Sequence, residues 1–513
     1  MTAARLRILL LVSMMAMLLV VAACGSGDDD DDNDNDVTPD DDTADDDTVF
    51  DDDTGDDDAT PDDDDATPDD DDDDTAPGPY DGMTPTGTTV DEMLAIASHM
   101  STGAAYSRER EFEIEKSVEA GITYSRRGFY WNHIEPENDV WQFDGYDEMV
   151  RLLREAGLQP NAMLTRGVDW AMPGGSPSDI DPADFADFTG TVADRYADDI
   201  DLYEIWNEQN STRFWDPEPD PEHYGLLLEA AYAAIHENDP NAIVLFGGMS
   251  PFDDVHLFDP RGIWNFLARV GEFHPDLCDF IDGVAIHPYT FLQQPGPELS
   301  LDFGIYRYPD LRNTVADVRG MLDELGCADK PIHFTEMGWP SLLIGNDRQA
   351  AYFVRGALLA RTVNVQGYFW YTFYDEEPGS SPPTEDYFGL YELPDGVTDP
   401  DPKPAYHALV GLHEVLGDAR YAGDLGLALG WENDCYALVF ADDASRWTVA
   451  LWHAGLQFGQ ETTVTVPLHS DATGDWTMLD QEGAQLATGN TADGEVEVAA
   501  DGRVVYLQFE VSP

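Results

Sequence analysis

Basic residues are scarce in this sequence of 513 residues. Lysine and arginine together number 25, against 104 aspartates and glutamates, which gives a formal net charge of −79. A chain this acidic repels phosphate groups, which argues against nucleic acids and anionic membrane surfaces as partners. The acidity is concentrated between Asp28 and Asp74, where 29 of 47 residues are aspartate. Because such a segment has little apolar surface to bury and its charges repel one another, we predict a disordered tether over residues 24–90.

An apolar run near the N-terminus, residues 8–21, follows Arg5 and Arg7. The run is too short for a stable membrane-spanning helix and is typical of a secretory signal. It ends in Val-Ala-Ala-Cys-Gly at residues 21–25, which resembles the lipobox of bacterial lipoproteins. The resemblance implies that residues 1–23 are a signal peptide, that Cys24 is lipidated, and that the protein is anchored at the bacterial cell surface or in the periplasm. The alternative is an ordinary signal peptide in which Cys24 is incidental.

The aspartate run then acts as a spacer between the lipid and the folded part. Isolated aspartate repeats lack a preorganised cage of oxygen ligands, so we favour a solvated spacer over a calcium site.

Cysteine is also rare, with four residues in the chain. Cys278 and Cys327 each precede a predicted strand, so we expect both at the lower ends of neighbouring strands. In an exported protein we predict a disulfide between them, and two buried thiols remain the alternative. Cys435 is left without a partner and is expected to pack as a small hydrophobic side chain.

A glycine-rich phosphate loop is missing after the early predicted strands, which argues against an open doubly wound sheet. From residue 94 onward, short apolar runs alternate with segments that have apolar residues on one helical face. Eight strands are predicted, at 94–100, 122–128, 159–164, 202–207, 242–248, 283–287, 332–336 and 367–372. Eight strand–helix units over residues 91–416 predict a closed (β/α)8 TIM barrel, whose chemistry belongs at the carboxyl ends of its strands.

The pattern changes at residue 417. Short strands of alternating polarity, separated by turns rich in aspartate and glycine, predict a small antiparallel β-sandwich over residues 417–513. We interpret its residues Trp447 and Trp452 as core packing rather than as glycan contacts.

Two glutamates follow buried strands of the predicted barrel. Asn207 and Glu208 stand side by side at the end of the fourth strand, and Glu336 ends the seventh. Cleavage of a glycosidic bond requires two carboxyl groups, one to protonate the leaving oxygen and one to attack the anomeric carbon. For both Asn207 and Glu208 to reach the cleft, the strand has to be irregular there, as bulges near active sites allow.

Other strand ends carry side chains that fit the same chemistry. Arg126 can keep a nucleophile ionised, although an arginine at a strand end can also be a surface residue, which suits Arg127 better. His287 and Tyr289 can hydrogen-bond sugar hydroxyls and the nucleophile, and the alternative for His287 is a core histidine. Trp370 at the barrel mouth is expected to form a flat platform for a sugar ring. Trp131 follows the second strand as a further candidate substrate contact.

Several motifs are similar to those of the clan A glycoside hydrolases. They are Tyr-Glu-Ile-Trp-Asn-Glu at 203–208, His-Pro-Tyr at 287–289, Thr-Glu-Met-Gly-Trp at 335–339, Phe-Trp-Tyr-Thr-Phe at 369–373 and the segment from Arg126 to Pro136. Within the clan, the sequence most resembles glycoside hydrolase family 39 and its endoglycosidase relatives. The resemblance covers residues 94–416 and leaves out the tether and the β-sandwich.

The resemblance implies a role for each matching residue. Glu208 is the expected acid/base and Glu336 the expected nucleophile of a retaining mechanism. Asn207 and Trp370 are expected to line the −1 subsite, supported by Arg126, His287 and Tyr289.

These observations predict a surface-tethered retaining glycosidase that acts on a β-linked poly- or oligosaccharide. We expect no cofactor and no metal, because the histidines at 99, 133, 287 and 333 lack paired ligand spacing. We expect a monomer that meets the membrane only through its lipid. Tryptophans in the loops after the strands, at 131, 141, 170, 215 and 339, favour endo-action slightly. The alternative is a glycan-binding lipoprotein that has lost turnover.

Overall fold

The computed structural model describes residues 78–512, apart from 104–105, 252–262, 291–292, 303–306, 377–378, 380–382, 395–397, 432–433, 444 and 457. The predicted signal peptide, the lipidation site Cys24 and the aspartate run therefore lie outside the described residues. Within the described part of the chain, no helix is both long enough and apolar enough to span a membrane.

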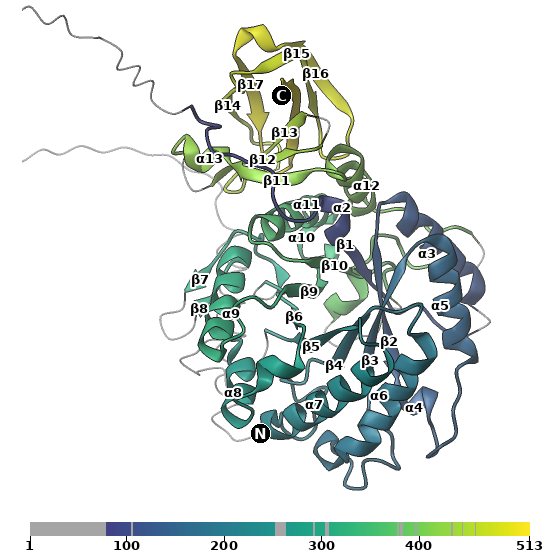
Figure 1. Cartoon of the computed structure of the whole chain (residues 1–513). Coiled ribbons are helices and arrows are strands. Elements are labelled where there is room, and N and C mark those ends of the chain that lie inside the picture. Colours follow the sequence, from purple (N-terminus) through teal and green to yellow (C-terminus); the bar gives the residue numbers. More distant parts are fainter. Residues whose placement is uncertain are drawn as a thin grey trace, which may run out of the picture. The chain divides into compact units, whose positions relative to one another are not determined.

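Eight parallel strands close into a barrel, in the order β1-β10-β9-β6-β5-β4-β3-β2 (Figure 1). They are β1 (Leu94–Ala97), β2 (Tyr124–Tyr130), β3 (Gln159–Thr165), β4 (Leu202–Asn207), β5 (Ile243–Met249), β6 (Gly283–Ile286), β9 (Ile332–Met337) and β10 (Gly367–Tyr371). Every predicted barrel strand is present, with ends that differ by at most three residues. The structure thus confirms the predicted TIM barrel.

Helices cover the outside of the barrel (Figure 1). They are α3 (Ser107–Glu119), α5 (Asp144–Ala156), α6 (Pro182–Tyr196), α7 (Pro221–Asn238), α8 (Asn265–Phe273), α9 (Leu311–Leu325), α11 (Asn346–Thr362) and α12 (Pro404–Leu416). Local sequence explains their ends. The Asp181 side chain accepts a hydrogen bond from the Ala183 amide at the start of α6, and Pro182 follows it. Gly326, with φ of 84°, ends α9 in the left-handed conformation that glycine adopts without strain.

The residues after the barrel form the predicted antiparallel domain. A six-stranded sheet has the order β11-β12-β13-β18-β15-β16, and a pair, β14 and β17, forms a second sheet. The strands are β11 (Arg420–Asp424), β12 (Cys435–Ala441), β13 (Arg446–His453), β14 (Thr462–Pro467), β15 (Ala472–Leu479), β16 (Gln485–Asn490), β17 (Glu495–Ala500) and β18 (Val505–Val511). The edge strands β11 and β16 contain no fully buried residue, so they lack the apolar alternation that identifies a strand in a sequence.

Residues 78–90 differ from the predicted disordered tether. Tyr80 is 5% exposed, packs in the core of the antiparallel domain and donates a hydrogen bond to the Pro467 carbonyl at 2.7 Å. Thr86 forms a bridge with Tyr421. Residues 78–90 therefore belong to the folded part of the chain, because one buried aromatic side chain holds this segment on the antiparallel domain.

A buried polar cluster joins the two folded domains. Arg355 on α11 forms an ion pair with Glu298 and donates a hydrogen bond to the Gly502 carbonyl at 3.1 Å. The Trp452 indole, on β13, donates to Glu298 at 2.9 Å. Trp452 is fully buried, and Trp447 packs against Tyr80. Both tryptophans therefore pack in the structure, as the sequence predicted.

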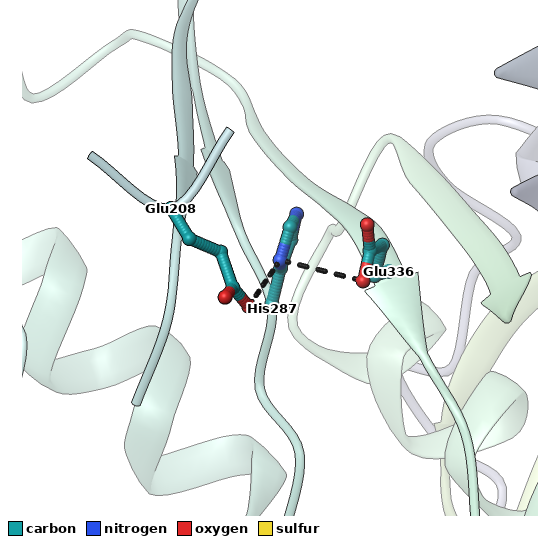
Figure 2. Close-up of side chains that lie close together, drawn as sticks. All are labelled: Glu208, His287 and Glu336. Carbon is teal, nitrogen blue, oxygen red and sulfur yellow. Dashed lines mark hydrogen bonds and ion pairs between the residues drawn. The ribbon is translucent and has the colours of Figure 1, made fainter. Parts of the chain in front are cut away.

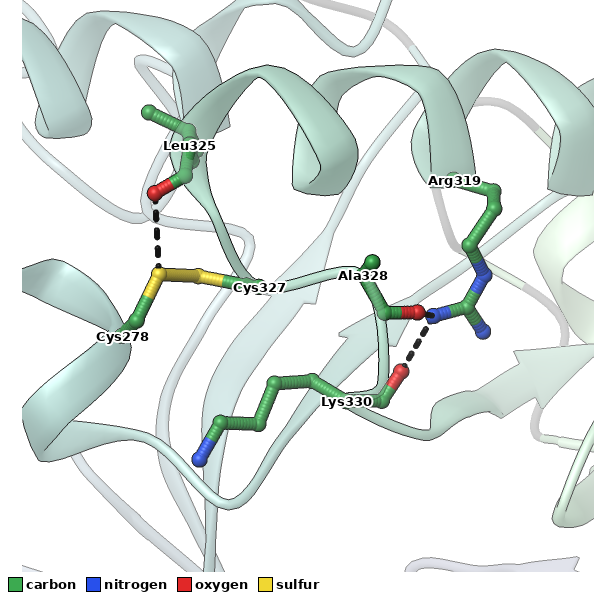
Figure 3. The surroundings of a disulfide bond; sticks show 6 residues. All are labelled: Cys278, Arg319, Leu325, Cys327, Ala328 and Lys330. Carbon is green, nitrogen blue, oxygen red and sulfur yellow. Dashed lines mark hydrogen bonds between the residues drawn. A yellow bond between two sulfur atoms is a disulfide. The ribbon is translucent and has the colours of Figure 1, made fainter.

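Cys278 and Cys327 form a disulfide (Figure 3). Cys278 lies just before β6 and Cys327 just before β9, and these strands are neighbours in the barrel. Arg319 of α9 donates hydrogen bonds to the carbonyls of Ala328 and Lys330 beside the disulfide. The bond therefore connects two loops at the amino ends of the strands, opposite the end where chemistry is expected.

Candidate active site

The barrel interior changes from apolar to charged toward the carboxyl ends of its strands. Its apolar part contains Ala95, Leu202, Leu245, Ala285 and Phe369 in one buried cluster. Beyond this cluster, the carboxyl ends surround a cavity of about 230 Å³. The side chains of predicted functional residues that line it are Arg126, Asn207, Glu208, Tyr289 and Glu336.

Arg126 and Glu204 form the floor of this site. The Arg126 guanidinium donates from Nε and Nη2 to the two carboxylate oxygens of Glu204, at 2.7 and 2.9 Å. Both side chains are buried, with exposures of 4% and 0%. The Gly248 amide and the Thr335 hydroxyl also donate to Glu204, at 2.9 and 3.2 Å. Because four donors satisfy the buried Glu204 carboxylate, it can hold Arg126 in one orientation.

Arg126 also connects Glu204 to the predicted nucleophile. Its Nη1 donates to Glu336 at 2.6 Å, and its Nη2 donates to the Asn207 side-chain carbonyl at 2.9 Å. The Tyr289 hydroxyl donates to the other Glu336 oxygen at 2.9 Å. Burial by itself would raise the pKa of Glu336, but attraction to His287 and Arg126 and the hydrogen bonds from Arg126 and Tyr289 outweigh it and lower the pKa to about 2. Glu336 is therefore ionised at neutral pH.

Tyr289 stays protonated beside this carboxylate. Its burial, followed by the negative charge of Glu336, raises its pKa well above the ordinary value of a phenol. A phenol that keeps its proton remains a hydrogen-bond donor to Glu336.

His287 lies between the two predicted catalytic carboxyl groups (Figure 2). Its Nδ1 is 3.1 Å from Glu208 Oε1 and 3.6 Å from Glu336 Oε2. The nearest oxygens of the two glutamates lie within 4.8 Å of each other. Retaining glycosidases place their carboxyl groups about 5–5.5 Å apart, and inverting ones about 6.5–9.5 Å apart. The observed spacing agrees with the retaining geometry.

Gly248 makes room for this arrangement. A Cβ atom at this position would lie 2.1 Å from His287 Nε2 and 2.7 Å from a Glu204 oxygen. Only a residue without a side chain allows the imidazole and the buried carboxylate to approach the β5 backbone so closely.

Irregular backbone brings the glutamates into the cavity. At the end of β4, Trp206 has φ of 75°, and Glu208, which follows the strand, has φ of 46°. Trp206 therefore packs outside the barrel against Phe185 and Trp215, while both residues after it line the cavity. On β9, the register with β10 shifts, which allows Thr335 to reach Glu204 while Glu336 lines the cavity. The predicted irregularity of β4 is present, and β9 adds a second one.

Two predicted substrate contacts are wrong. Trp370 is fully buried outside the barrel wall, where its ring packs against Phe353 of α11 and its indole donates to the Phe388 carbonyl. Tyr371, the next residue along β10, lines the cavity instead, because successive side chains on a strand point to opposite faces.

Trp131 is also fully buried. Its ring stacks on Phe188 of α6, and its indole donates to Glu135 at 2.8 Å. Trp215 and Trp339 are fully buried as well, Trp141 and Trp170 are half-buried, and none of the five loop tryptophans lines the cavity. They pack loops against the barrel and do not support endo-action.

Sequence reasoning missed Glu204 and Tyr371. Glu204 had a usable signal, since a carboxylate between Tyr203 and Ile205 in a buried strand requires a basic partner. Tyr371 had no comparable signal, because the sequence does not reveal which face of β10 points into the barrel.

Glu208, His287 and Glu336 offer three ligand atoms close enough for one cation. Both Glu336 oxygens already accept hydrogen bonds, one of them from a guanidinium that would repel a cation. A second group, Glu135, Asp139 and Asp187, has the same spacing, but the Glu135 oxygens accept from Trp131 and from the Asp139 amide. The donor sets therefore fit hydrogen-bonded carboxylates better than metal ligands.

No protein-family model matches the sequence. The β-galactosidase BgaH of Haloferax lucentense is 42% identical to this chain over 67 residues, which are 12% of the chain and 10% of that protein. The chain thus matches only about a tenth of the length of this curated relative.

Solved structures match over much more of the chain. A family 39 glycoside hydrolase from Bacteroides cellulosilyticus WH2 has 21% identity and a TM-score of 0.64, and the match covers 84% of this chain and 83% of that one. A monomeric β-xylosidase from Caulobacter crescentus CB15 has 17% identity and a TM-score of 0.56, with 84% and 98% covered. This chain has their fold.

The shared fold includes more than the barrel. Residues 91–416 make up less than two thirds of the chain, so a match that covers 84% extends into the antiparallel domain. The expectation that the β-sandwich lies outside the shared region is therefore wrong. It failed because the resemblance depended on motifs at the barrel mouth, and a packing domain carries no such motifs.

Proposed function

We propose that this protein is a retaining glycosidase that hydrolyses O-glycosidic bonds of a β-linked oligo- or polysaccharide by double displacement. The observation that carries the proposal is the pairing of Glu208 and Glu336, with oxygens within 4.8 Å of each other, in one cavity at the carboxyl ends of the barrel strands. The fold of family 39 glycoside hydrolases and the partial match to a β-galactosidase support a β-glycoside as the substrate.

In the first step, the ionised Glu336 attacks the anomeric carbon while the bond from that carbon to the leaving oxygen breaks. Glu208 gives its proton to the leaving oxygen, so the departing sugar leaves as an alcohol and a glycosyl ester remains on Glu336. Arg126 and Tyr289 hold one Glu336 oxygen each, which fixes the direction of attack.

In the second step, the Glu208 carboxylate takes a proton from water as the water oxygen attacks the anomeric carbon. The ester bond breaks, Glu336 leaves as a carboxylate, and the configuration of the anomeric carbon is retained. Arg126 holds the side-chain carbonyl of Asn207, which lines the cavity. The side-chain NH2 of Asn207 can then donate a hydrogen bond to a sugar hydroxyl.

We also propose that the lipid on Cys24 anchors a monomeric enzyme to the bacterial cell envelope, with the aspartate run as spacer. Mass spectrometry of the mature protein tests this part separately. A diacylglyceryl group at Cys24 supports the anchor, and a protein cleaved elsewhere with an unmodified N-terminus contradicts it.

Leaving-group dependence tests the roles of the two glutamates. We expect wild-type protein to hydrolyse aryl β-glycosides and Glu336→Ala to lose turnover with all of them. Glu208→Ala should lose far less activity on a dinitrophenyl glycoside, which departs without a proton, than on a methylphenyl glycoside.

The stereochemistry of the first product provides a second readout. Proton NMR should show the β-anomer of the sugar before mutarotation. An α-anomer as first product would contradict the retaining mechanism, and glycan binding without any turnover would favour the glycan-binding lipoprotein.

A further inference from the structure

We propose that the cavity selects an anionic saccharide, one with a carboxylate or sulfate substituent held by Arg166 and Arg213. This inference deepens the proposed glycosidase function and rests on it for the meaning of turnover. It concerns a part of the cavity that the two-glutamate chemistry does not use.

Both arginines line the cavity that contains Glu208 and Glu336. Arg166 directly follows β3, and Arg213 lies in the loop between β4 and α7. The strands β3 and β4 are neighbours, and in the closed strand order β3 lies opposite β9, which carries Glu336. Arg166 and Arg213 therefore belong to the part of the barrel mouth that also carries Glu208.

Each guanidinium lies near an aromatic ring and not on a carboxylate. The Arg166 Cζ atom is 4.9 Å from the Tyr130 ring centre, and the Arg213 Cζ atom is 5.4 Å from the Phe214 ring centre. Among the residues that the structure describes, no carboxylate oxygen lies within 4.0 Å of either guanidinium. A ring beside a guanidinium limits its motion and leaves its N–H groups available to a ligand.

Arg166 also has an uncommon backbone conformation. Its φ is 64°, in the left-handed region that residues with a side chain adopt rarely and at a free-energy cost. Strained residues of this kind concentrate at functional sites. Arg166 thus has a strained backbone, lines the cavity and carries a guanidinium whose N–H groups are available to a ligand.

The acidic composition of the chain strengthens the argument that Arg166 and Arg213 bind an anion. The chain has only 25 basic residues against 104 acidic ones, and many of the described arginines pair with aspartate or glutamate, for example Arg126, Arg127, Arg195 and Arg355. The cavity itself also contains the carboxyl groups of Glu208, Glu336 and Glu385. A neutral sugar needs no cation there, whereas an anionic one would be repelled unless guanidiniums held it.

Calorimetry with paired oligosaccharides tests this proposal on the full chain. The probes are uronate-containing oligosaccharides of xylan, pectin and glycosaminoglycan type, each with its carboxyl-reduced form, and sulfated oligosaccharides with their desulfated forms. Glu336→Gln protein is used so that no probe is consumed. We expect at least one anionic probe to bind ten times more tightly than its neutral partner, with an advantage that falls as salt rises. The carboxyl-reduced and desulfated pairs show which anion is recognised.

Substitutions then locate the anion. We expect Arg166→Gln and Arg213→Gln to reduce the anionic advantage to less than twofold. Arg348→Gln is the matched control, because that guanidinium also lies by a ring, Phe458, but does not line the cavity, and it should leave the advantage unchanged. The proposal is overturned if no anionic probe binds better than its neutral partner, or if the advantage survives both cavity substitutions.

The two proposals fail in different ways. Hydrolysis of neutral aryl β-glycosides with no preference for anionic probes rejects this inference and leaves the glycosidase function intact. A guanidinium-dependent preference in binding, with no turnover of any glycoside, supports the anion site and rejects the glycosidase function.

Discussion

Two neighbouring arginines on β2 allow the inside of the barrel to be compared with its outer layer. Arg126 points into the barrel and contacts Glu204 and Glu336, and Arg127 points outward and contacts Glu113 of α3 at 2.7 Å. Both are buried, with exposures of 4% and 2%. The expectation that Arg127 is a surface arginine is therefore wrong, because α3 covers that face of the strand.

The comparison shows that burial and pairing do not by themselves identify a functional residue. Arg127 and Glu113 form a pair between a strand and a helix, which links two elements of the fold. Arg126 belongs to a chain of contacts that ends on two carboxyl groups lining an open cavity. Variants that separate turnover from stability test this distinction.

The largest effect on turnover is expected from Glu336→Gln. Without the attacking carboxylate, kcat on an aryl β-glycoside should fall by at least about 10⁴-fold. Glu113→Gln removes a carboxylate on the outer side that is more buried, with an exposure of 1% against 14% for Glu336, and should leave kcat within about threefold while it destabilises the fold. Steady-state kinetics and urea unfolding measure the two quantities. Similar loss of kcat in both variants would remove the distinction between inside and outside.

The second effect compares the arginines themselves. Each of Arg126→Gln and Arg127→Gln leaves a buried carboxylate unpaired and should lower the free energy of unfolding by about 3–5 kcal/mol. Only Arg126→Gln should also lower kcat/KM, by about 10²–10³-fold, because it removes a preorganised donor from the nucleophile. Kinetics well below the unfolding temperature separates the two variants. A comparable loss of kcat/KM in Arg127→Gln would contradict the assignment.

The third effect is a shift in pH dependence. Because the pKa of Glu336 is lowered to about 2, its carboxylate is ionised throughout the range above that pH, and the acidic limb of kcat/KM should not reflect its protonation near its usual value. Tyr289→Phe removes a donor to the charged form, so the pKa should rise and Glu336 should protonate at higher pH. We expect about a tenfold loss of kcat/KM at neutral pH and a steeper loss below about pH 5.

The control for that experiment is an outer tyrosine. Tyr374 donates its hydroxyl to the Glu109 carbonyl on α3, outside the barrel. In Tyr374→Phe, the acidic limb of the pH profile should coincide with that of the wild type. An acidic limb that does not move in Tyr289→Phe either would show that this phenol does not affect the charge on Glu336.

The smallest effect on turnover is expected at the opposite end of the barrel. The disulfide between Cys278 and Cys327 closes a loop with a sequence separation of 49 residues. Replacing both cysteines by serine should lower the free energy of unfolding by up to about 4 kcal/mol, because the unfolded chain gains freedom. It should change kcat by less than about twofold. A tenfold loss of kcat would show that the lower end of the barrel controls the site.

The two tryptophans that were wrongly assigned show where sequence reasoning ends. Trp370 and Tyr371 are adjacent, and both are suitable platforms for a sugar. A shift of one residue moves a side chain from the barrel interior to its outer face, so the choice depends on strand orientation and not on residue type. Trp131 has the same ambiguity, because a loop can bury an aromatic ring as readily as present it to a ligand.

Local periodicity and chain order were enough to predict the eight barrel strands, the antiparallel domain and the polar residues at the carboxyl ends of the strands. The folded chain is needed to see which atoms of these side chains are in contact. Glu204 reaches Arg126 across 78 residues of sequence, and Arg126 reaches Glu336 across 210. Such contacts depend on closure of the sheet and on the register shift between β9 and β10, and no local pattern encodes either of these. The sequence required β4 to be irregular at its end, but the positive φ angles of Trp206 and Glu208 that produce this irregularity are a feature of the folded chain.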